Sequence, residues 1–256
     1  MIKVIFFDID GTLLPCNSKE IPESTIKAIK MAQANGIKCV IATGRNKMEM
    51  EKLPLKEIHF DAYLTMNGQL TFDKNFNVLD SHPIHSGEME VLAQIFKAKK
   101  IPFELIGKDK HYINYVDDTV IHVRATTNGT VADIGTYEGE DIYQINAFVS
   151  QEQRKLLESF LDDCDITSWN DKGIDIISKG GGKSKGIKNF LKKFNIDSKE
   201  VMAFGDGEND IQMLKTAGIG VAMGNGKDIV KEAANYVTDA CDQDGIYNAL
   251  KHFELI

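Results

Sequence analysis

Two acidic residues directly follow a short apolar run near the start of the chain. The stretch "VIFFDIDGTLL" spans residues 4 to 14 and places Asp8 and Asp10 just ahead of Gly11 and Thr12. An ionised carboxylate removed from water costs several kcal/mol unless a partner compensates it. A surface Asp-Gly turn would explain the pair without any chemistry. The motifs elsewhere in the chain must decide between these interpretations.

Three further segments carry reactive side chains beside apolar strands or ahead of a helix. They contain Thr43 and Gly44 in "VIATGR", Lys183 and Lys185 in "KGGGKSKG", and Asp206 and Asp210 in "AFGDGEND". The four-residue spacing of the last pair corresponds to one helical turn. Ligands of parallel α/β sheets bind beyond the carboxyl ends of the strands. We therefore expect these segments to converge in one crevice.

The converging side chains suit phosphoryl transfer. Crowded carboxylates repel one another unless a hard cation lies among them, so Asp8, Asp206 and Asp210 are candidate ligands of Mg²⁺. A carboxylate nucleophile beside such a cation can accept a phosphoryl group. Lys183 supplies positive charge, and Asp10 is placed to protonate the leaving oxygen.

Phosphate oxygens also need hydrogen-bond donors. The hydroxyl of Thr43 and the backbone N–H groups around Gly44 can donate to them, as open amides at a strand-to-helix turn commonly do. Arg45 follows in the same motif. Its side chain either contacts the substrate or pairs with an acid, and the sequence favours neither role.

The elements that position these residues follow a βαβα order at both ends of the chain. "VIFF", "IKCVIAT" and "DAYLTM" are apolar runs, and the helical pattern "ESTIKAIKMAQAN" ends at Gly36. Near the C-terminus "VMAFGD", "IQMLKTAG", "IGVAMG" and "KDIVKEAAN" repeat the alternation. Such strands predict an α/β fold, a Rossmann-like parallel sheet covered on both faces.

The middle of the chain has a different texture. Between residues 82 and 180, the stretches "YINYV", "IHVRAT" and "IYQINAFV" show partial period-two alternation. This pattern predicts strands of a sheet with one wet face. We expect residues 82–180 to form an inserted α+β domain, and residues 1–81 and 181–256 to form one discontinuous α/β core domain.

Composition narrows the classes of partner. The 256 residues are 43% hydrophobic and carry a formal charge of −8, without a basic stripe interleaved with aromatic residues, which disfavours nucleic acid. No stretch approaches 18 apolar residues, so no membrane partner is expected. The four cysteines are far apart and form no C-x-x-C pair. A cytoplasmic protein is expected.

Taken together, the motifs resemble those of a known superfamily. "DIDGTL", "TGR", a lysine ahead of a helix and "GDGEND", in this order, resemble the four motifs of the haloacid dehalogenase (HAD) superfamily. The insert of roughly 100 residues between the second and third motifs, with "NG" after the third strand and "AMGNG" near the end, is similar to the Cof-type subfamily IIB. In that subfamily the inserted domain is a cap.

The resemblance implies a Mg²⁺-dependent phosphatase of small phosphorylated metabolites. Asp8 would be the nucleophile that becomes phosphorylated, and Asp10 the acid that protonates the leaving group and then activates water. Thr43 would bind the transferring phosphoryl group, which Lys183 would neutralise. Alignment by the following helix favours Lys183, although Lys185 with Gly186 also resembles the third motif.

The resemblance also implies the ligands of the cation. Mg²⁺ would be held by Asp8, the backbone carbonyl of Asp10 and Asp206, with Asp210 either a ligand or a neighbour of the ligands. Asn209 would help to bind phosphate. Within the superfamily a phosphomutase is the alternative, because mutases share the nucleophile and a related cap.

Other interpretations of single motifs are weaker. "GKS" at residues 182 to 184 invites a P-loop, but the first glycine that motif needs is replaced by Ile177. His82 and His85 lie three residues apart, but Pro83 breaks a helical face and no third zinc ligand is evident. A non-catalytic phosphometabolite-binding protein is a further alternative, although such a protein needs no acid two residues beyond a nucleophile.

The sequence leaves the substrate and the oligomeric state open. No pattern within residues 82–180 selects among sugar phosphates, phosphorylated cofactors and polyol phosphates as substrate. The oligomeric state is equally open, and a monomer is plausible.

Overall fold

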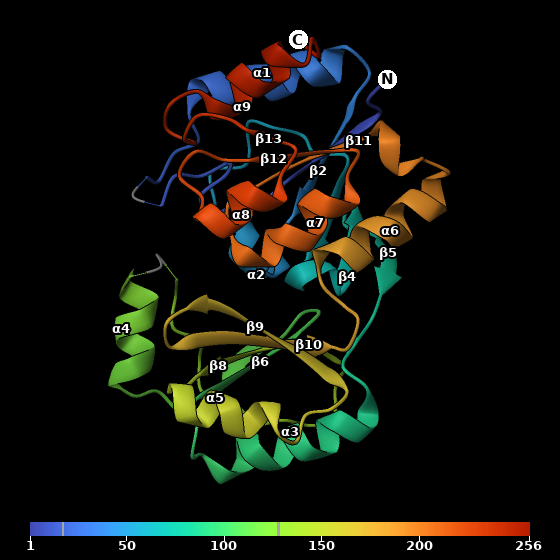
Figure 1. The fold of residues 1–256 in the computed structure, drawn as a ribbon. Helices are drawn as coiled ribbons and strands as arrows, with labels where there is room; N and C mark the ends of the chain where they lie inside the picture. Colours follow the sequence, from blue (N-terminus) through green and yellow to red (C-terminus); the bar gives the residue numbers. More distant parts are fainter. Residues whose placement is uncertain (17, 127–128) are drawn as a thin grey trace. The chain divides into compact units, whose positions relative to one another are not determined.

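The computed structural model describes residues 1–16, 18–126 and 129–256, which divide into two compact units (Figure 1). Unit 1 combines Met1–Ser81 with Gly182–Ile256, and unit 2 is His82–Gly181. These bounds differ by one residue, Gly181, from the division expected from the sequence. Among the described residues, no helix is both long and apolar enough to cross a membrane.

Unit 1 is built on an eight-stranded sheet with the order β13-β12-β11-β1-β2-β3-β4-β5. The strands from β13 to β3 pair in parallel, whereas β4 and β5 are antiparallel additions at one edge. The strands are β1 (Val4–Phe7), β2 (Lys38–Ala42), β3 (Ala62–Thr65), β4 (Leu70–Asp73), β5 (Val78–Ser81), β11 (Val201–Gly205), β12 (Ile219–Ala222) and β13 (Tyr236–Val237).

Helices cover both faces of this sheet, as the fully apolar strands predict. In β1, Ile5 and Phe7 belong to the core that includes residues of α1 and α9, whereas Val4 and Phe6 belong to the core that includes residues of α6, α7 and α8 (Figure 1). The helices are α1 (Glu23–Ala34), α2 (Lys47–Met50), α6 (Lys183–Phe194), α7 (Ile211–Thr216), α8 (Asp228–Ala233) and α9 (Gly245–His252), with 3₁₀ turns η1 (Met66–Gly68), η2 (Ser198–Glu200) and η3 (Glu208–Asp210).

Unit 2 has its own antiparallel sheet, with the order β7-β6-β8-β10-β9. Residues of α3 and α5 form the main core of this unit with apolar side chains from one face of the sheet, and Val120 and Val123 of α4 join a smaller cluster with Phe148. The elements are α3 (Ser86–Ala98), β6 (Phe103–Gly107), β7 (His111–Ile113), α4 (Asp118–Thr126), β8 (Ile142–Phe148), α5 (Gln151–Glu158), β9 (Cys164–Asn170) and β10 (Gly173–Ser178).

Two expectations for the middle segment are wrong. "IHVRAT", expected as a strand, lies in helix α4, where the carboxylate of Asp117 accepts from the backbone N–H of Val120 and so caps the first turn. The buried positions Val120 and Val123 are three residues apart, which is a helical spacing. The expected wet face is also absent from β8, because every residue of Ile142–Phe148 is buried.

Candidate active site

Parallel pairing brings the motif residues of unit 1 to one edge of the sheet. Strand β1 lies between β11 and β2, and Phe7 pairs in register with both Phe204 and Ile41. Asp8 follows β1 directly, and its backbone N–H donates to the carbonyl of Phe204. The loops that follow these three strands carry the first, fourth and second motifs. The topology therefore explains why residues about 200 positions apart meet.

Asp8, Asp206 and Asp210 form a tight acidic cluster. One carboxylate oxygen from each lies within 4.8 Å of the others. Asp8 is 6% exposed and Asp210 is fully buried. The second oxygen of Asp210, Oδ2, accepts from the backbone N–H groups of Asp206 (3.0 Å) and Gly207 (2.9 Å), which fixes the loop after β11. Asp210 belongs to the 3₁₀ turn η3 and Asp206 precedes that turn, so the expected α-helical turn between them is not formed.

Lys183 is buried among these acids. Its Nζ donates to Oδ1 of Asp8 at 2.5 Å and to Oδ1 of Asp210 at 2.6 Å, and the residue is 1% exposed. It is the first residue of α6, so the helix start carries the amine into the cluster. Lys185, the other lysine of the motif, is exposed. The structure thus places Lys183, rather than Lys185, beside Asp8.

The cluster holds more negative than positive charge. Burial raises the pKa of Asp8 well above its usual range, and Lys183 only partly opposes this rise. Burial, and next the charge of Asp210, raise the pKa of Asp206 to about 7. Burial alone would lower the pKa of Lys183, but Asp210 and Asp8 outweigh it and raise that pKa. One ammonium against three carboxylates leaves the ionised site short of positive charge.

A divalent cation fits this donor set. Its side-chain donors are all carboxylate oxygens, the ligand type that Mg²⁺ prefers, and they lie close enough to share one ion. Two positive charges would balance the excess of carboxylates, which adds to burial in raising the pKa values of Asp8 and Asp206. The carboxylate of Asp10, also a candidate from the sequence, does not belong to the cluster, so only its backbone carbonyl is available as the expected ligand.

Gly11 and Thr12 contact the side chain of Asp206. Gly11 has φ +81°, and a Cβ atom built on it would lie 2.2 Å from Oδ2 of Asp206, so a side chain cannot be accommodated there without movement. The hydroxyl of Thr12 donates to Oδ1 of Asp206 at 3.0 Å. Both residues stand in the motif "DIDGTL", but neither was expected from the sequence to have a role. Their types, a glycine and a hydroxyl directly after the acids, were the available signal.

Asp10 faces an arginine. Arg45 Nε donates to Oδ2 of Asp10 and Arg45 Nη2 donates to Oδ1, both at 2.7 Å. The side chain of Asp10 is 47% exposed and that of Arg45 is 15% exposed. Of the two roles left open for Arg45, the structure shows pairing with an acid, and that acid lies in the same unit.

Thr43, Gly44 and Asn209 meet around Asn67. The Thr43 hydroxyl accepts from the backbone N–H of Arg45 at 3.1 Å, which leaves its own proton to donate. Asn67 has φ 55° and ψ 35°, and its backbone N–H donates to the carbonyl of Thr43. The amide of Asn209 donates to Oδ1 of Asn67 at 3.2 Å. Asn67 was not among the site residues expected from the sequence, although the Asn-Gly pair after the third strand signalled its left-handed backbone.

Gly44 also lies close to Asn67. A Cβ atom on Gly44 would lie 3.4 Å from Nδ2 of Asn67, so the loop after β2 and the turn η1 are in contact. Thr43, Gly44 and Asn209, which were expected to bind phosphate, therefore lie at the same edge of the sheet as the acidic cluster, on the loops after β2 and β11, and Asn67 joins them from the loop after β3.

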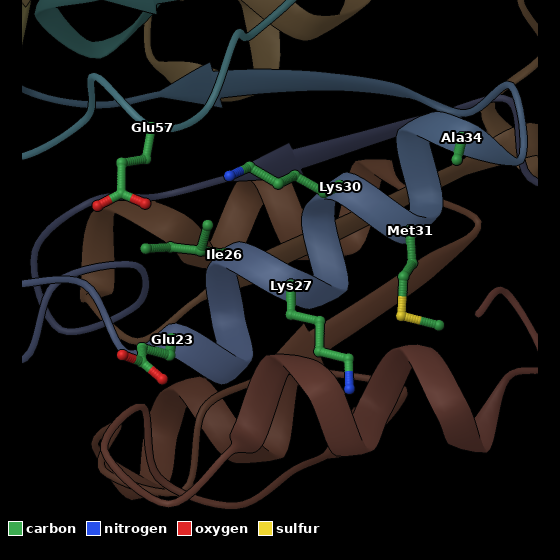
Figure 2. Close-up of a pocket in the computed structure, with 7 residues that line it drawn as sticks. All are labelled: Glu23, Ile26, Lys27, Lys30, Met31, Ala34 and Glu57. Carbon is green, nitrogen blue, oxygen red and sulfur yellow. The ribbon is translucent and has the colours of Figure 1, made fainter.

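A separate hollow of about 470 Å³ lies against α1 (Figure 2). It is lined by Glu23, Ile26, Lys27, Lys30, Met31, Ala34 and Glu57. None of the expected site residues lines it. Its lysines and glutamates do not reproduce the acid and donor arrangement found after β1, β2 and β11.

Comparison with known proteins identifies the family. The model of the haloacid dehalogenase-like hydrolase family matches residues 5–250, nearly the whole chain. The chain belongs to the haloacid dehalogenase superfamily. This confirms the family expected from the four motifs. The expected enzyme class, a HAD phosphatase, is also confirmed, because relatives that match over the whole chain are named phosphatases.

Several HAD proteins resemble this chain over its full length. The 5-amino-6-(5-phospho-D-ribitylamino)uracil phosphatase YcsE of Bacillus subtilis is 33% identical over 99% of this chain and 96% of its own. The structure of BT1666 from Bacteroides thetaiotaomicron, a HAD phosphatase, has a TM-score of 0.92 and 30% identity over 100% of this chain and 96% of its own. The structure of the subclass IIB sugar phosphatase BT4131 has a TM-score of 0.87 and 35% identity over 99% of this chain and 100% of its own. The α/β fold class expected from the sequence is confirmed by these similarities.

Proposed function

We propose that this HAD phosphatase hydrolyses small phosphorylated metabolites, with Mg²⁺ as cofactor and a phosphorylated Asp8 as intermediate. The observation that carries the proposal is the buried contact of Lys183 with both Asp8 and Asp210 inside a cluster of three carboxylates. A structural ion pair would need one acid for one lysine. The surplus of acids at the carboxyl edge of a parallel sheet instead suits a cation and a phosphoryl group.

In the first half-reaction a carboxylate oxygen of Asp8 attacks phosphorus. The bond from phosphorus to the leaving oxygen breaks, and Asp10 gives its proton to that oxygen. The products are an alcohol and phospho-Asp8. Lys183 and the Thr43 hydroxyl hold the charged oxygens of the transferring group, and the amide of Asn209 adds a further donor.

In the second half-reaction Asp10 takes a proton from water as the water oxygen bonds to phosphorus. The bond from phosphorus to Asp8 breaks, which releases phosphate and restores both acids. Mg²⁺ held by Asp8, the backbone carbonyl of Asp10 and Asp206, with Asp210 as a ligand or close neighbour, would supply positive charge that offsets the charge of the phosphoryl oxygens. Backbone N–H groups around Gly44 would add donors to those oxygens.

A phosphate-release screen tests this function. The panel contains sugar phosphates, polyol phosphates and phosphorylated cofactors, each assayed with Mg²⁺ and with a chelator. Of the relatives named above, YcsE is named for a ribitylaminouracil phosphate and BT4131 for sugar phosphates, so polyol and sugar phosphates are the first compounds to assay. Phosphate release that depends on Mg²⁺ and is abolished in Asp8→Asn supports the proposal. Activity of Asp8→Asn within tenfold of wild type would contradict it.

We assign substrate selection to unit 2, as the resemblance to capped HAD proteins implies. Replacement of residues 82–180 by a short Gly/Ser linker should change the ranking of substrates while some activity on a small activated phosphate remains. If the shortened protein folds and the ranking is unchanged, selection lies in unit 1. Transfer of the phosphoryl group to a sugar rather than to water would instead identify a phosphomutase.

A further inference from the structure

Asn225 bridges two loops at the edge of the sheet that carries the acids. Its Nδ2 donates to the backbone carbonyl of Gly11 at 2.8 Å, and its Oδ1 accepts from the backbone N–H of Cys241 at 2.9 Å. Asn225 follows β12, and strand β11 lies between β12 and β1. The side chain therefore spans from the loop after β12 to the loop after β1, past β11, the strand that Asp206 follows.

The carbonyl that accepts from Asn225 belongs to Gly11, which packs closely against Asp206. Gly11 has φ +81° and leaves no room for a side chain against Asp206. Its N–H donates to the carbonyl of Leu14 at 2.8 Å, so both peptide groups that flank its Cα are fixed, one by Leu14 and one by Asn225. The first of these peptides carries the backbone carbonyl of Asp10, an expected ligand of the cation. Movement of Gly11 would displace that carbonyl relative to Asp206.

The loop that presents Asn225 is itself held in place. The N–H of Gly224 donates to the carbonyl of Asp239, and the N–H of Gly226 donates to the carbonyl of Met223. A Cβ atom on Gly226 would lie 3.1 Å from the backbone oxygen of Asp206, so this loop packs closely against the Asp206 backbone. Asn225 thus connects the Gly11 loop, which carries the Asp10 carbonyl, to the loop after β12, which packs against the backbone of Asp206.

The position of Asn225 argues against a role in folding alone. The residue is exposed, so it buries little surface. A hydrogen bond of this kind contributes only about 0.5–1.5 kcal/mol to stability. Partners that orient metal ligands, by contrast, commonly change metal affinity by about 10- to 100-fold when they are removed.

We propose that Asn225 is a positioning residue that holds the Gly11 loop against Asp206 and thereby sets the affinity of the site for its divalent cation. This inference rests on the proposed function, because it concerns the cation of that site. It adds a residue to which neither the motifs nor the acidic cluster assigned a role.

Two variants test the bridge. Asn225→Ala removes both hydrogen bonds, whereas Asn225→Asp keeps the acceptor for Cys241 and loses the donor to Gly11. The added negative charge of Asn225→Asp would by itself strengthen cation binding. Weaker binding in both variants would therefore identify the lost bond to Gly11 as the cause.

The primary measurement is Mn²⁺ binding to the substrate-free protein by electron paramagnetic resonance. We expect the Mn²⁺ dissociation constant to rise about tenfold in both variants. The Mg²⁺ concentration for half-maximal turnover should rise in parallel, while kcat at saturating Mg²⁺ stays within about threefold of wild type. Asn248→Ala is the matched control, because Asn248 is an exposed amide that donates to Asp239 in the neighbouring loop and should leave Mn²⁺ binding unchanged.

The outcomes separate this inference from the proposed function. Wild-type Mn²⁺ affinity in both Asn225 variants would overturn the inference, and loss of Mn²⁺ binding in Asp206→Ala would show that the metal site itself stands. A fall in kcat and melting temperature with unchanged Mn²⁺ affinity would also overturn it, because that pattern indicates a structural role. If the wild-type protein binds no Mn²⁺, both the inference and the proposed metal dependence fail.

Discussion

Arg45 and Asp10 form a two-point ion pair in which each carboxylate oxygen of Asp10 accepts one N–H at 2.7 Å. A bidentate guanidinium fixes the plane of a carboxylate as well as its position. The proposed donor and acceptor of protons is thus oriented by a residue from the loop after the neighbouring strand β2.

Loss of Arg45 should impair proton transfer more than attack on phosphorus. In Arg45→Met, the first turnover of a sugar phosphate should slow about tenfold, less than the 10²- to 10⁴-fold expected when a general acid is removed. The burst of phenolate from p-nitrophenyl phosphate needs no acid and should keep its rate. Rapid mixing measures the first turnover of the sugar phosphate and the rate of the phenolate burst. Lys47→Met, which removes a partly exposed pair with Glu51, is the control. If Arg45→Met slows the reactions of both substrates equally, Arg45 does not have this role.

Removal of the acid itself should separate the two half-reactions. In Asp10→Asn, the first step with a sugar phosphate should slow by about 10²- to 10⁴-fold because the leaving alkoxide is not protonated. With p-nitrophenyl phosphate, the phenolate leaves unaided but phospho-Asp8 lacks the base that activates water. We expect a phenolate burst close to one equivalent of enzyme, followed by a slow steady rate. Without a burst, and with both substrates slowed alike, Asp10 would act mainly in metal binding or local structure.

Mg²⁺ should stabilise the folded protein through the acidic cluster. Because the repelling carboxylates are close only in the folded state, Mg²⁺ at 100 times its dissociation constant should add about 2.7 kcal/mol to the free energy of unfolding. Thermal melting with Mg²⁺ and with chelator measures this effect. Asp206→Asn should lose most of the Mg²⁺-dependent increase. Glu208→Gln, in the same loop but paired with Lys227 at the surface, should keep it, and an equal loss in both variants would argue against a site at Asp206.

Stability of unit 2 should depend on the buried carboxylate of Glu104. Burial alone would raise the pKa of Glu104, but the hydrogen bond from His111 and the charge of Arg124 outweigh it and lower the pKa below its ordinary value of 4.5. A lowered folded-state pKa contributes stability above pH 4.5, and this contribution disappears as the pH falls through the folded-state value. Glu104→Gln should therefore cost about 3 kcal/mol at pH 7, and the cost should shrink below pH 4.5.

Fluorescence of the single tryptophan reports on this prediction. Trp169 lies in unit 2 and packs edge-on against Phe148, so urea unfolding followed by its emission monitors this unit. The control is Glu158→Gln, which removes a surface pair with Arg154 and should cost less than about 1 kcal/mol at any pH. A difference between wild type and Glu104→Gln that grows as the pH falls would contradict the assignment.

The sequence predicted the α/β frame because its signals are local. Apolar strands such as "VIFF", and a helix that ends at Gly36, depend on neighbours within a few positions, and the structure has β1 and α1 in those places. "IHVRAT" was misread because its β-branched residues resemble a strand, whereas the decisive features are the cap from Asp117 and the packing of Val120 and Val123. Burial of both faces of β8 involves residues remote in sequence, since Phe148 packs with Val120 and Val123 of α4, and Asn146 donates to Glu104.

The candidate site was predictable where a residue type is tied to its chemistry. Acids after β1 and β11 and a lysine ahead of α6 are such cases, and the structure gathers Asp8, Asp206 and Lys183. The contacts of Arg45, Asn67 and Asn225 could not be read from the sequence. Each is a hydrogen bond between loops whose partner is set by strand order, and neither arginine nor asparagine specifies a partner by its type alone.

The discontinuity of unit 1 also affects how the chain can fold during synthesis. Strand β1 pairs on one side with β2, which emerges soon after it, but on the other side with β11, which begins at Val201. At about 5–20 residues per second, the ribosome needs roughly 6–24 s to add the 119 residues from 82 to 200. Throughout that interval β1 has an unpaired edge, and Asp8 lacks its buried lysine until Lys183 is added. Unit 2, with a core of its own, has its complete sequence first. The nascent chain therefore exposes an apolar parallel-sheet edge that is prone to association until β11 is made, which makes chaperone dependence during expression an expected property of this protein.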